Sequence, residues 1–276
     1  MDADELDIAY KKCQKMTEEY YAVSAAQAYI EPQIATKSGE DISFRYLMGT
    51  EQARDWYSGH TLEQLDFEAK SESGETLKIV REGDVVLDCG AHTGFYATYF
   101  AKTVGPAGFV FAFDPYPQNV DLIEYNALLN GLTNVMAVQK AIGSQPRALF
   151  LSQDCQNATQ GSEQRLIRTF ETTIDSYLRF SPTFLKIDIE GYEVEALRGA
   201  QAVMKTRPRF HLEVHGPLLH LFGHNVEDVV AQLPSVEDYD YYLKTVSPDG
   251  PVSKIRKISS LQLDDGLFST LLGVPK

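Results

Sequence analysis

The sequence predicts an α/β fold of the Rossmann-like type, in which helices cover both faces of a mostly parallel sheet of seven strands. From residue 76 onward, short apolar runs alternate with segments of helical periodicity, which is the pattern of a doubly wound sheet. The first of these runs ends in Asp88, and Gly90 and Gly94 follow it. This order predicts a buried strand, a tight turn and a helix, which is where open α/β sheets bind their ligands.

The individual elements follow from apolar runs that are bounded by turn residues. Strands are expected over residues 85–88, 109–114, 134–138, 184–189, 209–214, 241–246 and 267–274, with a short added strand over 148–152. Helices are expected over residues 95–101, 115–130, 191–204 and 225–233, with the end of a short helix at 77–81 and a connector at 172–178. The polar segment 153–164 indicates a mobile loop that serves as a lid.

Two domains are expected, with a boundary near residue 75. Residues 1–75 are predicted to form a helical cap on the substrate side, with helices over 4–30 and 61–69 and a strand over 42–48. Residues 76–276 then form the cofactor-binding domain. The cap contains four ring-bearing residues that either pack as an aromatic patch on the core, the favoured alternative, or line a substrate pocket. They are Tyr46, Trp56, Tyr57 and His60.

The composition argues against several classes of partner. The chain has 276 residues and a formal net charge of −14, which disfavours binding to DNA or RNA. Its apolar runs are too short to span a bilayer, and its acidic start differs from a secretory leader. The three cysteines form no C-x-x-C motif. We therefore expect a cytoplasmic protein without membrane insertion that acts on a small molecule. The composition is compatible with a homo-oligomer and leaves the oligomeric state open.

The glycine turn indicates a nucleoside cofactor that has no pyrophosphate. A dinucleotide site has the spacing G-x-G-x-x-G, whereas His92 stands here where the second glycine of that motif belongs. A side chain at this position crowds a pyrophosphate, and S-adenosylmethionine has none. Asp114 ends the next strand about 20 residues after the turn. At this position an acid accepts hydrogen bonds from ribose hydroxyls in nucleoside sites. The alternative is an ordinary glycine turn of a dinucleotide-type fold.

A group of charged residues is predicted at the same edge of the sheet. Side chains alternate along a strand, so Lys186 and Asp188 share one face of their strand, and Glu213 and His215 share one face of the next. If the two strands are parallel neighbours, their polar ends meet the acids of the earlier strands. The carboxyl edge then collects Asp88, Asp114, Asp188, Glu190, Glu213 and His215.

Two kinds of chemistry are open to this group, beside a purely structural role. His215 is suited to be the general base for a substrate hydroxyl, with Asp188, Glu190 and Lys186 as catalytic neighbours. Alternatively, Asp188, Glu213 and His215 hold a divalent ion, and oxygen-rich ligation with one imidazole suits Mg²⁺ or Mn²⁺. The structural alternative is a network of Lys186 with its acids that braces the sheet edge.

Five stretches of the chain together resemble the FkbM family of S-adenosylmethionine-dependent methyltransferases. They are residues 86–96, 112–119, 140–143, 184–193 and 213–215, and the run Lys-Ile-Asp-Ile-Glu-Gly that starts at Lys186 is the most specific. The resemblance covers about residues 77–216. It implies a class I methyltransferase fold, with S-adenosylmethionine bound by residues 76–276. It also implies methylation of hydroxyl groups on sugars, polyketides and related natural products.

The resemblance implies a set of cofactor-binding residues as well. They are Asp88, Gly90, His92 and Gly94 at the methionine end, Asp114 and Asn119 at the ribose, and Ala141 and Ile142 at the adenine. Two of them depart from the family pattern, which usually has Glu in place of Asp114 and often has Asn in place of His92. A shorter carboxylate still reaches a ribose diol, whereas the role of His92 stays open.

Two rival functions remain to be tested. An NAD-dependent oxidoreductase uses the same kind of sheet, but the spacing from Gly90 to Gly94 disfavours a dinucleotide. A non-catalytic nucleoside-binding module predicts that the cofactor binds without methyl transfer. The charged strand ends argue against such a module, because buried charges are costly unless they are paired or used.

Overall fold

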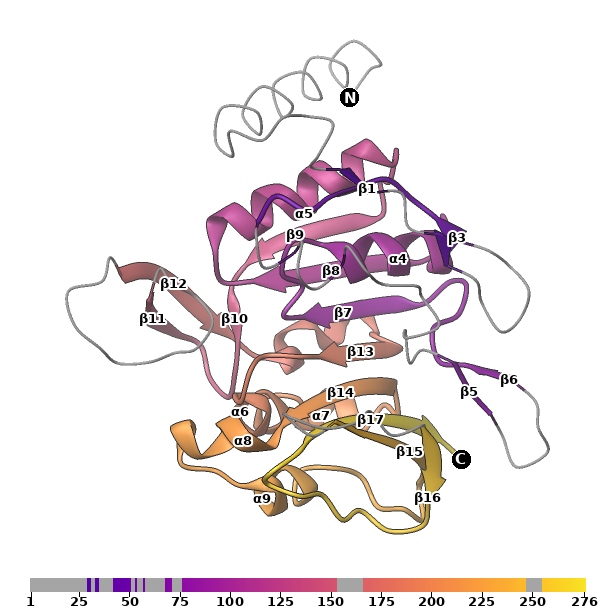
Figure 1. The fold of residues 1–276 in the computed structure, drawn as a ribbon, viewed down its shortest axis with the longest axis vertical. Coiled ribbons are helices and arrows are strands. Elements are labelled where there is room, and N and C mark those ends of the chain that lie inside the picture. The colour runs from indigo at the N-terminus through magenta and orange to yellow at the C-terminus, as the bar shows by residue number, and fades with distance from the viewer. Residues whose placement is uncertain are drawn as a thin grey trace.

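The structure, a computed structural model, describes residues 29–30, 33–34, 42–50, 53, 57, 68–70, 76–152, 166–246 and 255–276. One large sheet forms the centre of the molecule, and a smaller sheet projects from its side (Figure 1). Residues 4–28 of the helix predicted over 4–30, the predicted loop over 153–164, and Trp56 and His60 lie outside the described residues. None of the described helices is long and apolar enough to cross a membrane.

The central sheet has eight strands rather than the predicted seven. Their spatial order is β16 (Arg256–Ile258), β15 (Tyr239–Val246), β17 (Phe268–Pro275), β14 (Arg209–His215), β13 (Phe184–Ile187), β7 (Val85–Cys89), β8 (Phe109–Asp114) and β9 (Val135–Gln139). The five strands from β14 to β9 are parallel, whereas β17, β15 and β16 pair antiparallel. The Rossmann-like, mostly parallel architecture is thus confirmed. The prediction lacked β16, a three-residue edge strand that is too short and polar to give a hydrophobic pattern.

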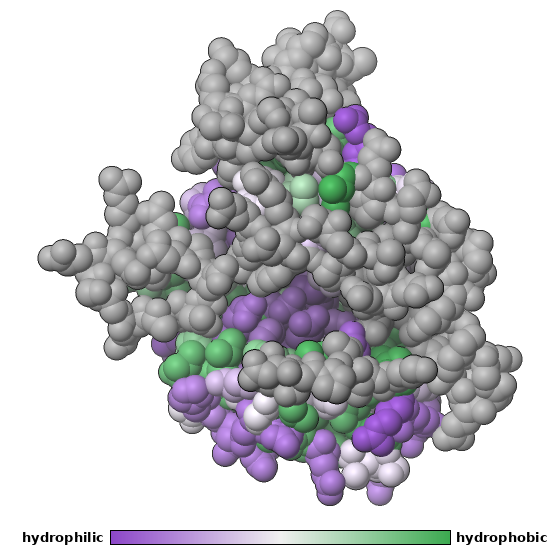
Figure 2. All heavy atoms as spheres, in the orientation of Figure 1, coloured by the Kyte–Doolittle hydropathy of each residue, from purple (hydrophilic) through white to green (hydrophobic). Residues whose placement is uncertain are grey.

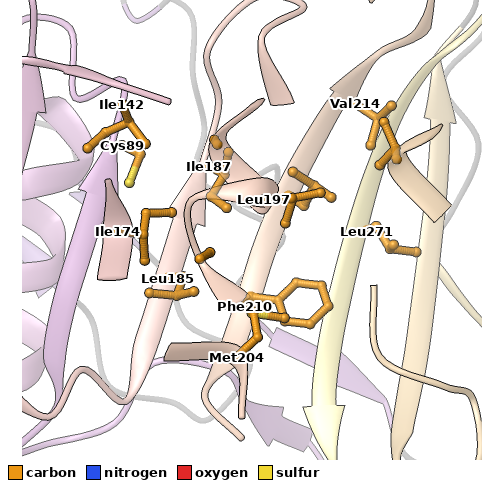
Figure 3. Packing of buried hydrophobic residues seen from close by; sticks show 14 of the residues in the cluster. Cys89, Ile142, Ile174, Leu185, Ile187, Leu197, Met204, Phe210, Val214 and Leu271 are labelled. Atoms are coloured by element: carbon orange, nitrogen blue, oxygen red, sulfur yellow. The ribbon is translucent and has the colours of Figure 1, made fainter. Parts of the chain in front are cut away.

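Helices cover both faces of this sheet, as predicted. The helices α4 (Phe95–Val104) and α5 (Pro117–Leu129) pack on one face. The opposite face carries η2 (Ile174–Phe180), α6 (Glu193–Arg198), α7 (Gln201–Met204), α8 (Gly216–Leu219) and α9 (Val226–Val230), and η3 (His220–Phe222) follows α8. Figure 3 shows this second core, in which Leu185, Ile187 and Phe210 of the sheet pack toward Leu197 and Met204.

The helix predicted over residues 191–204 is divided into α6 and α7. The second piece has its own cap, because the carboxylate of Asp175 accepts hydrogen bonds from the backbone N–H groups of Ala202 (2.9 Å) and Val203 (2.8 Å). Such a cap satisfies N–H groups that lack a partner within the helix. The break therefore lets η2 close against the start of α7 and complete the core under β13.

The projecting sheet contains β10 (Ala141–Ile142), β12 (Leu166–Thr172) and β11 (Arg147–Ser152) in that order. The predicted added strand is therefore confirmed as β11, while its partner β12 was not predicted. Three two-stranded pairs lie nearer the N-terminus. They are β1 (Tyr29–Ile30) with β4 (Tyr46–Leu47), β2 (Gln33–Ile34) with β3 (Ile42–Ser43), and β5 (Glu68–Lys70) with β6 (Thr76–Lys78).

These short pairs correct several predictions for the N-terminal region. The strand expected over residues 42–48 is two short strands, β3 and β4, and the helix expected to reach residue 30 gives way to β1. The helix predicted over 61–69 is wrong at its end, where β5 begins at Glu68, and the helix end predicted at 77–81 is β6 and a turn. The apolar residues there are spaced as on a helix, but cross-strand pairing decides the backbone conformation.

The aromatic residues of the N-terminal region pack on the core. Tyr46 is fully buried with its ring edge on Phe95 (centroids 5.1 Å apart), and Tyr57 stacks on the same ring at 4.5 Å. The favoured packing alternative is thus confirmed for Tyr46 and Tyr57. This packing fixes Phe95, the first residue of α4, directly after the glycine turn.

Candidate active site

Lys186 is the central cation at the carboxyl edge of the sheet. Its side chain is fully buried on β13, and its Nζ atom lies 3.3 Å from Asp88 Oδ1 and 3.2 Å from Asp188 Oδ2. The same Nζ donates to the Gly90 carbonyl oxygen (3.2 Å) and lies 5.1 Å from the ring centre of Tyr96. Burial lowers the pKa of Lys186, but the charges of Asp188 and Asp88 outweigh it and raise that pKa above its usual value. The bracing network of the structural alternative is therefore present.

Asp88 faces Lys186 across the β7–β13 pair. The register places the two residues opposite each other, and Asp88 is fully buried. Apart from Lys186, no described residue offers a hydrogen bond to either of its carboxylate oxygens. Burial raises the pKa of Asp88, although the charge of Lys186 opposes that shift. The carboxylate thus retains acceptor capacity next to the glycine turn.

His215 ends β14 with carboxylates around both ring nitrogens. Its Nδ1 lies 2.8 Å from Glu193 Oε1, and its Nε2 lies 3.5 Å from Glu190 Oε2 and 3.7 Å from Asp188 Oδ1. Burial alone lowers the pKa of His215, but the hydrogen bond to Glu193 and the surrounding negative charges raise it to about 10. At neutral pH the ring is therefore a cation within an acidic cluster.

Glu213 completes the predicted group of three possible ligands. A carboxylate oxygen of Glu213, one of Asp188 and a ring nitrogen of His215 all lie within 4.8 Å of one another. Burial and the charge of Asp188 raise the pKa of Glu213 to about 7, against the opposing effect of His215. Two carboxylates and one imidazole at this spacing fit a hard divalent cation.

Glu190 is held in a backbone conformation that is rare for a residue with a side chain. Its φ is +55°, and the next residue, Gly191, has a φ of +99°. Its side chain is 40% exposed, against 23% for Asp188 and 0% for Glu193, so it is the most open of these three carboxylates around His215. Strained backbone of this kind is kept where the surroundings enforce it, and it is frequent at functional sites.

Replacing Glu190 by glycine is expected to separate stability from activity. Relief of the positive φ stabilises the fold by about 1 kcal/mol, whereas loss of the carboxylate lowers kcat about tenfold. Ser181→Gly is the matched control, because Ser181 has the same φ of +55° after η2, outside the acidic cluster. Thermal unfolding measures the first effect, and the rate of the reaction that the family resemblance implies measures the second. Equal activity losses in both variants contradict the expectation.

The glycines of the turn have a packing role. At Gly90, with φ +82°, a Cβ atom would lie 1.8 Å from the backbone oxygen of Asp188, and at Gly94, with φ +87°, it would lie 2.9 Å from Ile123 Cα. The backbone N–H groups of Gly90 and Ala91 both donate to the Phe113 carbonyl oxygen, at 3.0 and 2.9 Å. These contacts explain the glycines without a ligand. Contact of Gly90 and Gly94 with a cofactor stays a prediction.

His92 lies within this turn, and Asp114 on the neighbouring strand accepts a hydrogen bond from its backbone. His92 has a φ of +50°, and burial lowers its pKa to about 4, so its ring is neutral at pH 7. Asp114 ends β8, where its Oδ1 accepts from the Tyr116 backbone N–H (2.9 Å) and from Asn119 Nδ2 (3.0 Å). Burial raises the pKa of Asp114 to about 7 despite these hydrogen bonds. Asn119 thus orients the carboxylate that was predicted to hold a ribose.

Ala141 and Ile142 form β10, directly after β9. Ala141 is half-buried, whereas Ile142 is 4% exposed and belongs to the core together with Cys89 (Figure 3). Contact of this strand with an adenine stays a prediction, and it would involve the strand's backbone rather than the buried Ile142 side chain. The sequence pattern does not distinguish these two possibilities, because both residues are apolar.

The structure brings the predicted residues together at one edge of the sheet. The cluster around the two cations contains Asp88, Lys186, Asp188, Glu190, Glu193, Glu213 and His215. Asp114 ends the adjacent strand at the same edge. The space-filling view shows hydrophilic side chains gathered in a hollow at the middle of this face, over β7 and β13 (Figure 2). Carboxylates outnumber cations there, which favours a positively charged ligand.

Glu193 is the member of the cluster to which sequence reasoning gave no role. It lies in the first turn of α6, is 0% exposed, and accepts hydrogen bonds at one oxygen from the Gly191 N–H and from His215. The available signal was its place two residues after Gly191, the last residue of the most specific motif. Acids are common in the first turn of a helix, so the sequence did not distinguish Glu193 from ordinary surface acids.

Comparison with known proteins identifies the family to which this chain is similar. Residues 88–243, more than half of the chain, match the family described as Methyltransferase FkbM domain. Among solved structures, the chain is similar to the methyltransferase FkbM from Methylobacillus flagellatus KT, with 18% identity and a TM-score of 0.43, over 69% of this chain and 43% of that one. The chain therefore spans less than half the length of that relative. A search of curated proteins finds no match.

Two further solved structures are similar at the same level. One is a putative rRNA-methylase from Clostridium thermocellum, with 13% identity and a TM-score of 0.42, over 71% of this chain and 89% of that one. The other is precorrin-6y C5,15-methyltransferase from Geobacter metallireducens GS-15, with 15% identity and a TM-score of 0.40, over 76% and 95%.

Proposed function

The chain belongs to the FkbM methyltransferase family, and from this premise we propose that it transfers a methyl group from S-adenosylmethionine to a hydroxyl oxygen of a small molecule such as a sugar. Family membership supports S-adenosylmethionine-dependent methyl transfer, and the fold is the Rossmann-like fold of class I methyltransferases. The observation that carries the finer proposal is the placement of His215, whose Nε2 faces Asp188 and Glu190 at the edge that also holds Asp88 and Asp114.

The charges at this edge support S-adenosylmethionine over a dinucleotide. Carboxylates exceed cations in the cluster, which suits the sulfonium cation and opposes the two negative charges of a pyrophosphate. Asp88 has acceptor capacity for the methionine end, and Asp114 with Asn119 is set to accept from ribose hydroxyls. His92 and Gly94 border the same turn.

When bound, S-adenosylmethionine supplies an electrophilic methyl group that an oxygen attacks in line. The protein then has to align the acceptor and remove one proton. In one version His215 takes the proton with Nε2, after releasing its own, while Asp188 and Glu190 bind acceptor hydroxyls. Lys186 holds Asp88 and Asp188 in place and ties them to the Gly90 turn.

In the second version, Asp188, Glu213 and His215 would hold Mg²⁺ or Mn²⁺. The divalent ion would lower the pKa of the acceptor hydroxyl, so that less basic side chains would suffice. The fit rests on the spacing of the three ligand atoms and on the Glu193 carboxylate behind His215, because a metal-binding imidazole usually donates its other N–H to such a group.

Titration calorimetry tests the cofactor directly. Binding of S-adenosylhomocysteine and none of NAD supports the proposal, and the reverse result would support the oxidoreductase. Binding without transfer to any hydroxylated acceptor in a methyl-transfer screen would instead leave a nucleoside-binding module. The same screen identifies the acceptor, because sugars and other natural products differ in which hydroxyl becomes methylated.

The affinity for S-adenosylhomocysteine is expected to fall as the pH falls below 7. The ionised form of Asp114 accepts ribose hydrogen bonds, and its pKa in the free protein is about 7. Protonation at lower pH therefore opposes binding, by about tenfold between pH 8 and pH 6. Calorimetry at several pH values measures the change. Asp114→Asn should bind more weakly with a flatter profile, and an unchanged slope in that variant contradicts the assignment.

A further inference from the structure

We propose that Glu193 is a positioning residue that fixes the ring of His215, so that Nε2 faces the hydrophilic cluster. The proposal rests on the proposed role of His215 and extends it to a residue that does not itself meet the acceptor. Glu193 is the first residue of α6, and His215 is the last residue of β14, so two separate segments meet in this contact.

The geometry gives one oxygen of Glu193 two donors. Oε1 accepts from the Gly191 backbone N–H at 2.9 Å and lies 2.8 Å from His215 Nδ1. An ionised carboxylate only accepts hydrogen bonds, so Nδ1 carries the proton and donates. The opposite ring nitrogen, Nε2, then points to Glu190 Oε2 at 3.5 Å and Asp188 Oδ1 at 3.7 Å.

A purely helix-capping role does not account for this residue. Glu195 lies in the same first turn of α6, remains partly exposed, and is held by Arg198 and by His224 (3.1 Å). The helix start thus already has an acid near the surface. Glu193 is instead 0% exposed, and complete burial of a carboxylate is costly unless strong hydrogen bonds compensate.

The shared oxygen makes two substitutions informative. In Glu193→Gln, the Gly191 N–H still requires an acceptor, so the amide oxygen takes the place of Oε1 and still accepts from His215 Nδ1. In Glu193→Leu, both hydrogen bonds are lost and the ring is free to turn. The matched control is Glu195→Leu, which removes the other acid of the same turn together with its histidine contact.

The test combines kinetics with proton NMR of the full chain. We expect Glu193→Leu to lower kcat by about tenfold to a hundredfold, as for other groups that orient a reactive histidine, with unchanged affinity for S-adenosylhomocysteine. Glu193→Gln should recover most of that loss, and Glu195→Leu should show none. The hydrogen-bonded Nδ1 proton of His215, assigned by its absence in His215→Gln, should persist in Glu193→Gln and vanish in Glu193→Leu.

Two results overturn the proposal: an unchanged Nδ1 proton signal in Glu193→Leu, or full activity in that variant after the signal is lost. If the leucine variant does not fold, Glu193→Asp replaces it, because the shorter side chain withdraws the acceptor and should also lose the signal. The NMR signal is independent of turnover. A His215→Gln enzyme with full activity would therefore refute the proposed role of His215 in the reaction, while the signal still reports whether Glu193 fixes the ring.

Discussion

Replacing His215 by glutamine is expected to lower kcat for methyl transfer by about 10²- to 10⁴-fold, the usual contribution of a positioned acid or base. In both versions of the proposed mechanism, Nε2 of His215 meets either the acceptor proton or the metal. Glutamine retains a polar side chain of similar size but accepts a proton poorly. The affinity for S-adenosylhomocysteine should stay unchanged, because the residues assigned to the cofactor lie on other segments than β14. Steady-state kinetics and calorimetry measure the two quantities.

The matched control for this variant is His224→Gln. His224 is also held by carboxylates, with Nε2 3.1 Å from Glu195 Oε1 and Nδ1 3.6 Å from Asp228 Oδ2, but it lies outside the cluster. Its replacement should leave kcat unchanged. Full activity and intact cofactor affinity in His215→Gln would contradict both versions of the mechanism.

Treatment of the wild-type enzyme with EDTA separates the two versions. In the metal version, activity disappears and returns with Mg²⁺ or Mn²⁺, because Asp188, Glu213 and His215 lose their ion. In the metal-free version, EDTA has no effect and the rate rises with pH toward about 10, since His215 must first release its proton. An EDTA-resistant enzyme whose rate does not rise between pH 7 and pH 9 excludes His215 as a simple base.

The sequence predicts the site well where the argument depends on strand alternation. Lys186 and Asp88 meet because β13 and β7 are parallel neighbours, and Lys186 is also opposite His211 on β14. Those neighbours follow from the order of a doubly wound sheet. Asp188 and His215 therefore converge as predicted, although they are 27 positions apart in the sequence.

The strand β12 was not predicted because polar residues lie on its inner side and an apolar residue lies on its outer side. Thr169 and Glu171 are buried, at 2% exposure each, while Phe170 is 50% exposed. Alternation alone assigns the apolar residues to the inside, whereas here Arg147 pairs with the buried Glu171 at 2.8 Å and makes the polar face the inner one. Pairing between residues 24 positions apart is not visible as a local period. Glu193 was missed for a related reason, since its burial depends on where β14 ends.

Replacing Lys186 by methionine is expected to destabilise the fold by about 3–5 kcal/mol, the usual cost of leaving a buried charge without its partner. Methionine fills a similar volume, but Asp88 then loses the cation that lies 3.3 Å away and Asp188 the one 3.2 Å away. The loss should be largest near neutral pH. It should shrink in acid, because protonation of the two carboxylates removes the uncompensated charge.

The double variant Lys186→Met with Asp88→Asn provides the decisive comparison. If the lost ion pair causes the effect, neutralising Asp88 should recover part of the stability, giving a coupling free energy above about 1 kcal/mol for side chains in direct contact. The exposed Lys205, at the end of α7, supplies the control, and Lys205→Met should change stability by less than about 0.5 kcal/mol. Chemical denaturation with urea measures five proteins: the wild type, Lys186→Met, Asp88→Asn, the double variant and the Lys205→Met control. If the losses of stability in the two single variants simply add in the double variant, Lys186 stabilises this edge of the sheet by packing alone. Its ion pairs with Asp88 and Asp188 would then not contribute to the stability of the fold.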